Sequence, residues 1–392
     1  MKLVQINVVC NGSTGKIMCD IAKEANKYKI NTYCFYGRGL PNKNVNCIRI
    51  GNKISVYFHV LLARLGLNGH GSYFVTKKLV KNLKKINPDV IHLHNVHGYY
   101  VNLEVLFKYL KNEYTGKIVW TLHDCWAFTG HCSYFTMIKC NKWKKHCKNC
   151  QQLNCYPSEC FDTTYIEYRT KKRLFTGLNN LTLVTPSEWL KKLVKQSFLK
   201  GYQTNVINNG IDIKVFKPTY DIEIYDKYNI PKNKKIILGV ANIWEERKGL
   251  NDFIELSKII DDNYIIVLVG IDEQVRKSLP NNVVAIPRTA NQTELAALYT
   301  ISTIFFNPTY EDNYPTTNLE SSACKTKIIC YDTGGCAEQI KKFNSGLVIK
   351  KGSLNSVITK LDELSNKPNV IKNIDYIGID KMTEEYIKLY KI

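Results

Sequence analysis

The sequence predicts an α/β protein built from two doubly wound parallel sheets. Short apolar runs alternate with stretches of helical spacing along nearly the whole chain, which is typical of parallel sheets with helices on both faces. With 392 residues and 44% hydrophobic content, the chain is long enough for two domains of ordinary size. Residues 206–218, which contain an Asn-Gly pair and end in proline, separate the two series of runs. We predict domains at 1–205 and 219–375, a linker at 206–218, and a C-terminal helical segment at 376–392 that can cross back to the first domain.

The first domain begins with a strand that leads into a glycine loop. Residues 3–9 are strand-like, Gly12 and Gly15 lie in the following CNGSTGK run, and helical spacing follows. Glycines let the backbone approach a phosphate, and a helix N-terminus favours an anion. A tight strand-to-helix turn without a ligand explains these residues about equally well. Further strands are predicted at residues 32–36, 90–94, 118–122 and 181–185.

Histidines follow two of these predicted strands. His92, His94 and His97 lie in IHLHNVHG, and His123 is followed directly by Asp124 in WTLHDCW. The carboxyl ends of parallel strands form the edge where open α/β sheets bind ligands. A single histidine is more often a satisfied polar residue than a catalyst, but a neighbouring carboxylate favours a working role. We therefore rank His123 above the other three as the functional histidine.

Residues 125–160 form a Cys-rich insertion without regular apolar spacing. Cys147 and Cys150 have the two-residue gap of a zinc knuckle, and Cys132 with Cys140 would complete four thiolates. His131 and His146 are alternative ligands. We predict a structural zinc here in preference to free thiols, because a segment with so little aliphatic pattern needs another source of order. The lysines interleaved with Trp143 could also bind phosphate.

The positive charge of the chain lies in its first half. The net charge is +21, with 31 Lys and Arg against 10 Asp and Glu in residues 1–200, and 24 against 24 afterwards. Such a surface suits a lipid headgroup layer, a diphosphate-bearing substrate or nucleic acid. The helix-like residues 55–67, followed by five lysines between 77 and 85, fit a membrane surface or a partly exposed core helix. No apolar run is long enough to span a membrane and the N-terminus lacks a cleavage site, so we expect a cytoplasmic protein.

In the second domain, strands are predicted at residues 236–241, 265–270, 283–286, 304–306 and 328–331. Functional groups follow three of them: Arg247 and Lys248, then Asp312 and Glu320, then Gly334 and Gly335. Cations and a glycine turn can surround a diphosphate, while a carboxylate can hold a ribose hydroxyl pair. Surface charges and helix caps would explain each group separately, but the whole set favours a nucleotide site.

These residues resemble glycosyltransferase family 4, the retaining GT-B enzymes, over nearly the whole chain. Asp312 and Glu320 match the E-x7-E motif of that family, with Asp in the first place. The nearest subgroup is similar to the colanic-acid type of bacterial exopolysaccharide and O-antigen transferases, which share the DNYPTTNLE wording and the Cys-rich insertion. The other segments that carry the resemblance are VTPSEWL at 184–190, NNGIDIKVF at 208–216, YDTGGCAEQI at 331–340, TLHD at 121–124 and the glycine loop.

The resemblance implies a GT-B architecture, in which two Rossmann-like domains face a cleft. The first domain would be the acceptor side and the second would bind the nucleotide sugar. The implied roles are Glu320 on the donor ribose, Asp312 as a catalytic group beside the donor sugar, Lys248 on the diphosphate, His123 at the reacting centre, and the Gly12–Gly15 loop near the donor phosphates or the acceptor. Asn242 stands where the family commonly has Arg, and Arg247 is the candidate to compensate.

The implied function is a retaining, metal-independent hexosyltransferase-type glycosyltransferase. It would move a sugar from a UDP- or GDP-linked donor to a lipid-diphosphate-linked glycan in the synthesis of O-antigen, capsule or exopolysaccharide. We expect a peripheral position on the inner face of an anionic membrane and no nucleic-acid partner. One alternative is a nucleotide-sugar epimerase of GT-B architecture, which needs neither acceptor nor membrane. A zinc-stabilised nucleic-acid-binding protein is the other, but it leaves Asp312, Glu320 and the glycine loops unexplained.

Overall fold

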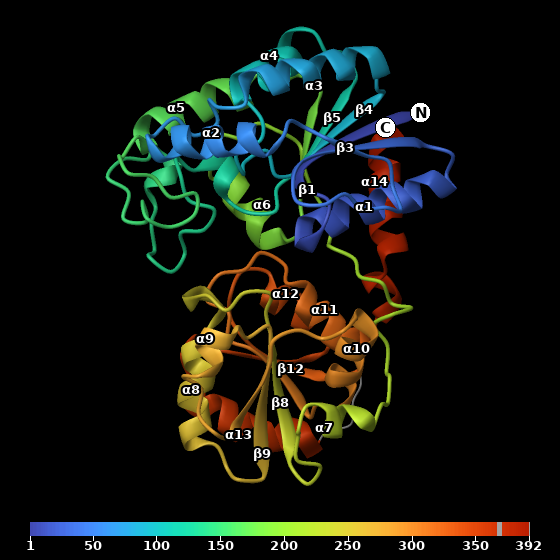
Figure 1. Ribbon diagram of the computed structural model, residues 1–392, viewed down its shortest axis with the longest axis vertical. Coiled ribbons are helices and arrows are strands. Elements are labelled where there is room, and N and C mark those ends of the chain that lie inside the picture. Colours follow the sequence, from blue (N-terminus) through green and yellow to red (C-terminus); the bar gives the residue numbers. More distant parts are fainter. Residues whose placement is uncertain (367–370, 392) are drawn as a thin grey trace. The chain divides into compact units, whose positions relative to one another are not determined.

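The structure is a computed structural model that describes residues 1–366 and 371–391. The chain divides into two compact units, Met1–Asn208 with the C-terminal helix from Met382 onward, and Asn209–Lys381. Each unit contains one parallel sheet with helices on both faces (Figure 1). The predicted α/β class with two Rossmann-like domains is therefore confirmed.

The described part of the first unit contains a seven-stranded parallel sheet in the order β3-β2-β1-β4-β5-β6-β7. Its strands are β1 (Lys2–Val9), β2 (Asn31–Arg38), β3 (Cys47–Arg49), β4 (Val90–Leu93), β5 (Lys117–Thr121), β6 (Leu181–Thr185) and β7 (Thr204–Val206). Its helices are α1 (Gly12–Lys27), α2 (Lys53–Arg64), α3 (Tyr73–Ile86), α4 (Leu103–Asn112), α5 (Thr164–Phe175), α6 (Glu188–Val194) and most of α14 (Ile379–Lys391).

The two faces of this first sheet have different chemistry. On one face, apolar side chains such as Val4 and Ile91 pack with α3, α4 and α5 in a single core. On the other face, the buried polar residues His92 and Thr121 hydrogen-bond to α14, through Tyr390 at 2.7 Å and Tyr386 at 2.9 Å. Helix α14, red in Figure 1, is thus fixed to the blue-green unit although it is the last segment of the chain.

The second unit contains a six-stranded parallel sheet in the order β10-β9-β8-β11-β12-β13. Its strands are β8 (Lys235–Val240), β9 (Tyr264–Val269), β10 (Val283–Ile286), β11 (Ile304–Asn307), β12 (Lys327–Tyr331) and β13 (Gly346–Ile349). Its helices are α7 (Glu223–Lys227), α8 (Leu250–Ile259), α9 (Glu273–Arg276), α10 (Gln292–Ile301), α11 (Thr316–Ala323), α12 (Cys336–Phe343) and α13 (Leu354–Asn366), with short 3-10 turns η3 (Glu246–Lys248) and η4 (Ile374–Ile377).

The strands of the second unit are apolar on both faces because helices cover both. Alternate residues such as Leu238 and Phe305 pack with α10, α11 and α12, while Ile237 and Phe306 pack with α8 and α13. Strands buried on both sides read as continuous apolar runs, which is why the sequence predicted them. The runs that the sequence did not reveal are β3, β7 and β13, which have three or four residues and only partial burial.

The segment predicted as a linker continues into the core of the second unit. The chain passes from one unit to the other between Asn208 and Asn209. Immediately after this point, Ile211 pairs with Gly378 and its backbone N–H donates to the Ile377 carbonyl at 2.8 Å. Phe216 is also buried in this core. Residues 209–218 therefore have a packing role in the second unit.

The Cys-rich insertion has no strand and is ordered partly by its own aromatic core. Its regular parts are the short 3-10 turns η1 (Trp126–Phe128) and η2 (Lys142–Lys144). The rings of Phe128, Phe135 and Trp143 contact one another, with centroids 4.9 Å apart for Phe135 and Trp143. Within the described ranges, no helix is long and apolar enough to cross a membrane.

Candidate functional site

The second sheet brings the predicted functional groups to one edge. Strands β8 and β11 are neighbours, but β9 and β10 lie on one side of this pair and β12 and β13 on the other. Ligands of open α/β sheets bind outside the carboxyl ends of the strands at such a switch point. Lys248 lies in η3 after β8, Asp312 follows β11, and Gly334 follows β12. Sequence-distant groups therefore converge where a ligand is expected.

Lys248 and Asp312 form an ion pair at this edge. The Lys248 Nζ lies 2.6 Å from the Asp312 Oδ2, and both side chains are partly exposed. The backbone keeps the two loops together, since the Tyr310 N–H donates to the Arg247 carbonyl at 2.8 Å. Gly249 allows this approach, because a Cβ there would lie 2.4 Å from the Pro308 carbonyl oxygen. The cation is thus held by a fixed backbone arrangement.

The Gly334-Gly335 turn packs directly on the Asp312 loop. Gly334 has a φ of +52°, and a Cβ on it would lie 1.7 Å from the Asp312 carbonyl oxygen. The Gly335 N–H donates to the Asn313 carbonyl at 2.8 Å. Gly335 also precedes the first turn of α12, and the N-terminus of a helix can attract an anion.

Glu320 and Arg247 are placed differently from this central group. Glu320 lies in the second turn of α11, which begins at Thr316, and it accepts a hydrogen bond from Tyr299 Oη at 3.2 Å. The Arg247 guanidinium is directed to the Glu245 carboxylate at 2.8 Å and the Glu311 carbonyl at 3.2 Å. It therefore links the two loops on which Lys248 and Asp312 lie.

A buried chain of amides holds these loops, and sequence reasoning missed it. Asn307 donates to Asn318 at 2.8 Å, Asn318 donates to Gln339 at 2.9 Å, and Gln339 donates to the Pro315 carbonyl at 2.9 Å. Buried amides need partners, and these link β11, α11 and α12 behind the site. The available signal was polar residues inside otherwise apolar elements, but their partners lie 11 to 24 residues away.

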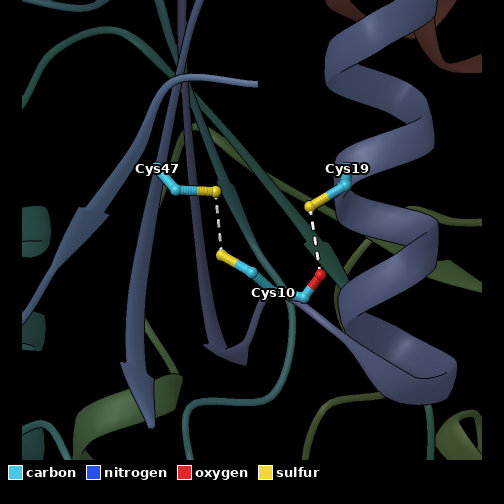
Figure 2. A group of neighbouring side chains, drawn as sticks. All are labelled: Cys10, Cys19 and Cys47. Atoms are coloured by element: carbon cyan, nitrogen blue, oxygen red, sulfur yellow. Dashed lines mark hydrogen bonds between the residues drawn. The ribbon is translucent and has the colours of Figure 1, made fainter. Parts of the chain in front are cut away.

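In the first unit, the glycine loop is fixed by close backbone packing and thiols. A Cβ on Gly15 would lie 2.7 Å from the carbonyl carbon of Cys10, whereas Gly12 has a φ of +74° and open space around it. Figure 2 shows the Cys10 and Cys47 sulfurs pointing at each other, 3.0 Å apart, and the Cys19 thiol donating to the Cys10 carbonyl. Burial raises the pKa of Cys47 to about 11, so this thiol is protonated at neutral pH.

His123 belongs to a hydrogen-bonded row of side chains across β1, β4 and β5. Gln5 donates its amide N–H to the Met18 carbonyl, so its oxygen accepts from His94 Nε2 at 3.0 Å. The Nδ1 of His94 then accepts from His123 Nε2 at 3.0 Å. This row leaves Nδ1 as the basic nitrogen of His123. The Asp124 carboxylate serves a different histidine, because its Oδ2 lies 3.0 Å from His97 Nε2.

Burial keeps the histidines of this row neutral. It lowers the pKa of His123 from 6.5 to about 4, and it lowers the pKa values of His92 and His94 well below the usual value. Groups that stay neutral in the folded state but ionise when unfolded make stability depend on pH. Between pH 6.5 and 4, the unfolded chain binds more protons than the folded chain, so stability falls on acidification.

We expect the thermal midpoint of the first unit to fall steadily between pH 6.5 and 4, measured by calorimetry. Replacing the exposed His146 with Gln should leave this dependence unchanged, since His146 is not part of the buried row. A midpoint that does not change over this range would contradict neutral burial of His92, His94 and His123.

The four cysteines of the predicted zinc site lie in the insertion but are not equally buried. Cys132 is buried, while Cys140, Cys147 and Cys150 are half-buried against the first core. A hydrogen bond from Cys132 lowers the pKa of Cys150. In the described part of the chain, two other groups bring three ligand atoms within 4.8 Å of one another: Cys10, Cys19 and Cys47, and His131, Glu159 and Glu167. The four-thiolate zinc site stays a prediction.

Comparisons with known proteins agree with this geometry. Residues 221–380 match the family model for glycosyl transferases group 1. The chain is 22% identical, over the full length of both proteins, to the protein of Escherichia coli K12 assigned to colanic acid biosynthesis as glycosyl transferase WcaC. A second relative, 29% identical over 46% of this chain and 52% of its own length, is the N,N'-diacetylbacillosaminyl-diphospho-undecaprenol alpha-1,3-N-acetylgalactosaminyltransferase of Campylobacter jejuni.

Solved structures match the whole fold. The sucrose-phosphate synthase of Thermosynechococcus elongatus has a TM-score of 0.70 at 14% identity, covering 100% of this chain and 98% of its own. HepE of Anabaena, in complex with UDP and glucose, has a TM-score of 0.67 at 13% identity, covering 100% and 99%. These structures establish the fold alone, whereas the family model and the sequence relatives bear on the kind of protein. The chain therefore carries a glycosyltransferase group 1 domain in its second unit and is a transferase with the GT-B fold.

Proposed function

We propose that this protein transfers a sugar, with retention of anomeric configuration, from a nucleotide-sugar donor to a lipid-diphosphate-linked glycan in bacterial surface polysaccharide synthesis. The observation that carries the proposal is the joining of Lys248, Asp312 and Gly334 at the switch point of the group 1 domain. One relative is named for colanic acid biosynthesis, and the other is named for a diphospho-undecaprenol acceptor. The surface polysaccharides meant here are O-antigen, capsule and exopolysaccharide.

Glycosyl transfer needs positive charge at the departing diphosphate. As the anomeric C–O bond to the diphosphate breaks, negative charge grows on the phosphate oxygens, and the acceptor oxygen forms the new bond. The acceptor proton leaves with the diphosphate. The Lys248 ammonium and the N–H groups at the start of α12 can stabilise that charge without a metal ion. Glu320, held by Tyr299, is suited to accept hydrogen bonds from the donor ribose.

The Lys248–Asp312 ion pair gives the short carboxylate a defined role. At 2.6 Å, Asp312 neutralises and orients the ammonium before a donor binds. A donor diphosphate would compete for Lys248, which leaves Asp312 beside the donor sugar to hold its hydroxyl groups. The HepE complex with UDP supports UDP as the first donor nucleotide to test, with GDP as the second.

His123 is proposed to position the acceptor and not to act as a strong base. Its Nε2–H is used by His94, so Nδ1 is the atom able to accept a hydrogen bond from an acceptor hydroxyl. With its pKa lowered to about 4 by burial, this nitrogen is a weak base at neutral pH. Orientation of the acceptor is therefore the contribution expected of His123, and the glycine loop of the same unit is proposed to approach phosphate.

An apolar face of α2 supports contact with an anionic membrane. Four large side chains are exposed along one stripe of this helix: Ile54, Tyr57, Phe58 and Leu61. Phe74 on α3 is 82% exposed, and five lysines follow it on that helix. Apolar side chains beside a basic surface are what an interfacial helix needs to bind anionic lipid. We propose that this face rests on the inner surface of the cell membrane, where the lipid-linked acceptor lies.

The double variant Phe58→Ser/Leu61→Ser should bind vesicles containing anionic lipid about 10- to 100-fold more weakly, since two partly inserted apolar side chains are lost. Flotation of the protein with vesicles that contain about 30% of the anionic lipid phosphatidylglycerol measures this binding. Tyr220→Ser is a matched control, because Tyr220 is equally large and exposed but lies in the second unit. Equal binding by the double variant and the wild type would remove α2 from the membrane face.

A transfer assay tests the proposed function directly. The protein is incubated with labelled UDP- and GDP-sugars and a lipid-diphosphate sugar, and a chain-extended lipid is expected. Release of an epimerised sugar nucleotide without lipid extension would favour the GT-B epimerase instead. The reaction should continue in the presence of a chelator, since the proposed transfer step uses no metal. For the insertion, the proposed zinc at Cys132, Cys140, Cys147 and Cys150 would be seen by metal analysis of the purified protein.

A further inference from the structure

Three buried ionisable side chains meet beneath the Cys-rich insertion. His131 lies near its start, Glu159 lies at its end, and Glu167 lies on helix α5. One ligand atom from each lies within 4.8 Å of the others. The side chains of His131 and Glu159 are fully buried, and Glu167 is 5% exposed. Such groups are rarely buried without a partner that balances their charge.

The hydrogen bond of His131 decides which ring nitrogen faces the carboxylates. Its Nε2 lies 3.3 Å from the Cys155 carbonyl oxygen, which can only accept, so Nε2 carries the hydrogen. In the neutral ring, Nδ1 then presents a lone pair, and it faces the Glu159 Oε1 at 3.3 Å. Neither of these two atoms has a hydrogen-bond partner. Two acceptors in this arrangement need a cation between them, either a proton or a metal ion.

Glu167 adds a third buried group to this cluster and increases the need for a cation. Its carboxylate lies within reach of Glu159 and of the Asn68 backbone N–H, and no cationic side chain of the described residues donates a hydrogen bond to it. The nearby Lys171 ammonium, one turn along α5, donates instead to the carbonyls of Trp126, Thr129 and Gly130 at 3.1 to 3.3 Å. The lysine therefore fixes the start of the insertion and does not bond to the carboxylate. The pair of glutamates remains open toward His131.

We propose that His131, Glu159 and Glu167 bind one divalent transition-metal ion of the Zn²⁺ or Mn²⁺ class. One imidazole nitrogen with two carboxylates suits these ions, whereas Ca²⁺ and Mg²⁺ prefer oxygen ligands alone. A carbonyl that receives the second ring N–H is the usual support of a metal-binding histidine. The ion would join both ends of the insertion to α5, so its role is structural. This site is separate from the four cysteines and does not depend on the proposed transferase activity.

The competing arrangement has protons in place of the metal ion, one between His131 and Glu159 and one shared by the two glutamates. The variant Glu167→Gln separates this arrangement from metal binding. Glutamine keeps the size and supplies an N–H, so it can replace a shared proton but is a poor metal ligand. With metal binding, this variant should contain one equivalent less Zn²⁺ plus Mn²⁺ by mass spectrometry. Its thermal midpoint should fall below that of the metal-loaded wild type. The exposed Glu188→Gln is the matched control and should keep the wild-type metal content and midpoint.

Further measurements make the result decisive. Cys150→Ser should keep the equivalent that Glu167→Gln loses, which distinguishes this ion from any bound by the cysteines. If Glu167→Gln does not fold, chelator-stripped Cys150→Ser is titrated with Zn²⁺ and with Mn²⁺, and its thermal midpoint is followed. A wild type whose metal content equals that of Glu167→Gln, or a stripped Cys150→Ser whose midpoint rises with neither ion, overturns the proposal in favour of the shared proton.

Discussion

Replacing Lys248 with methionine should lower kcat/KM for sugar transfer by about 10²- to 10³-fold, the size found when one fixed donor to a developing oxyanion is removed. Methionine keeps much of the length of the side chain but has no charge. Since Lys248 is the cation fixed at the switch point of the second sheet, its loss should act mainly on kcat. Steady-state kinetics over a range of donor concentrations measures both constants.

Two companion variants show whether the charge itself is responsible. Lys258→Met removes a similar lysine from an exposed surface pair of the same unit and should leave the kinetics unchanged. Asp312→Asn removes the ion-pair partner but keeps the ammonium, so it should impair transfer less than Lys248→Met if Asp312 mainly orients the lysine. Wild-type kinetics in Lys248→Met would show that the diphosphate is bound elsewhere.

The fold could be predicted because strands that are buried on both faces appear in the sequence as continuous apolar runs. Runs such as residues 265–270 read as continuous apolar strands, and helices between them complete the pattern. The short edge strand β13 has little buried surface, and it was not predicted from the sequence. The predicted linker was read from an Asn-Gly pair and a proline, and those turn signals did not reveal that Phe216 packs in the second core.

The residues of the candidate site could be predicted from the sequence, but the contacts between them could not. Glycines and charges after strands identify the edge where Lys248 and Asp312 lie, because parallel strands end together. Their ion pair joins residues 64 positions apart, and no local pattern encodes such a contact. Adjacency in sequence was even misleading for His123, whose neighbour Asp124 bonds to His97. Successive side chains after a strand point in different directions, so a neighbouring carboxylate need not be a partner.

The buried cluster of His131, Glu159 and Glu167 could not be predicted from local sequence spacing either. In the insertion, the sequence predicts a metal site at the cysteines because their spacing is a known metal pattern. A histidine and two glutamates separated by 28 and 8 residues have no such spacing, and Glu167 lies outside the insertion on α5. Only the folded chain shows that these groups share one buried space in which His131 Nδ1 and Glu159 Oε1 are left without a hydrogen-bond partner.

Replacing Gly334 with alanine should disable donor binding by moving the Asp312 loop. The added Cβ would lie 1.7 Å from the Asp312 carbonyl oxygen, and a backbone atom cannot move aside as a side chain can. The positive φ of +52° adds strain of about 1 kcal/mol for alanine. Donor nucleotide affinity, measured by calorimetry, should fall by about 100-fold, since an ångström-sized displacement of a positioning loop has that order of effect. The second unit should also unfold at a lower temperature.

Gly352→Ala separates the collision from the backbone strain. Gly352 has a φ of +74° in the same unit, but the nearest atom to an added Cβ would be the Tyr310 hydroxyl at 3.7 Å, an ordinary contact. This control should carry the strain of about 1 kcal/mol and keep donor affinity within roughly twofold. If Gly334→Ala behaves like Gly352→Ala, the glycine pair is only a helix start. If affinity falls in Gly334→Ala alone, the close packing of Gly334 on the Asp312 carbonyl is what positions the carboxylate beside Lys248.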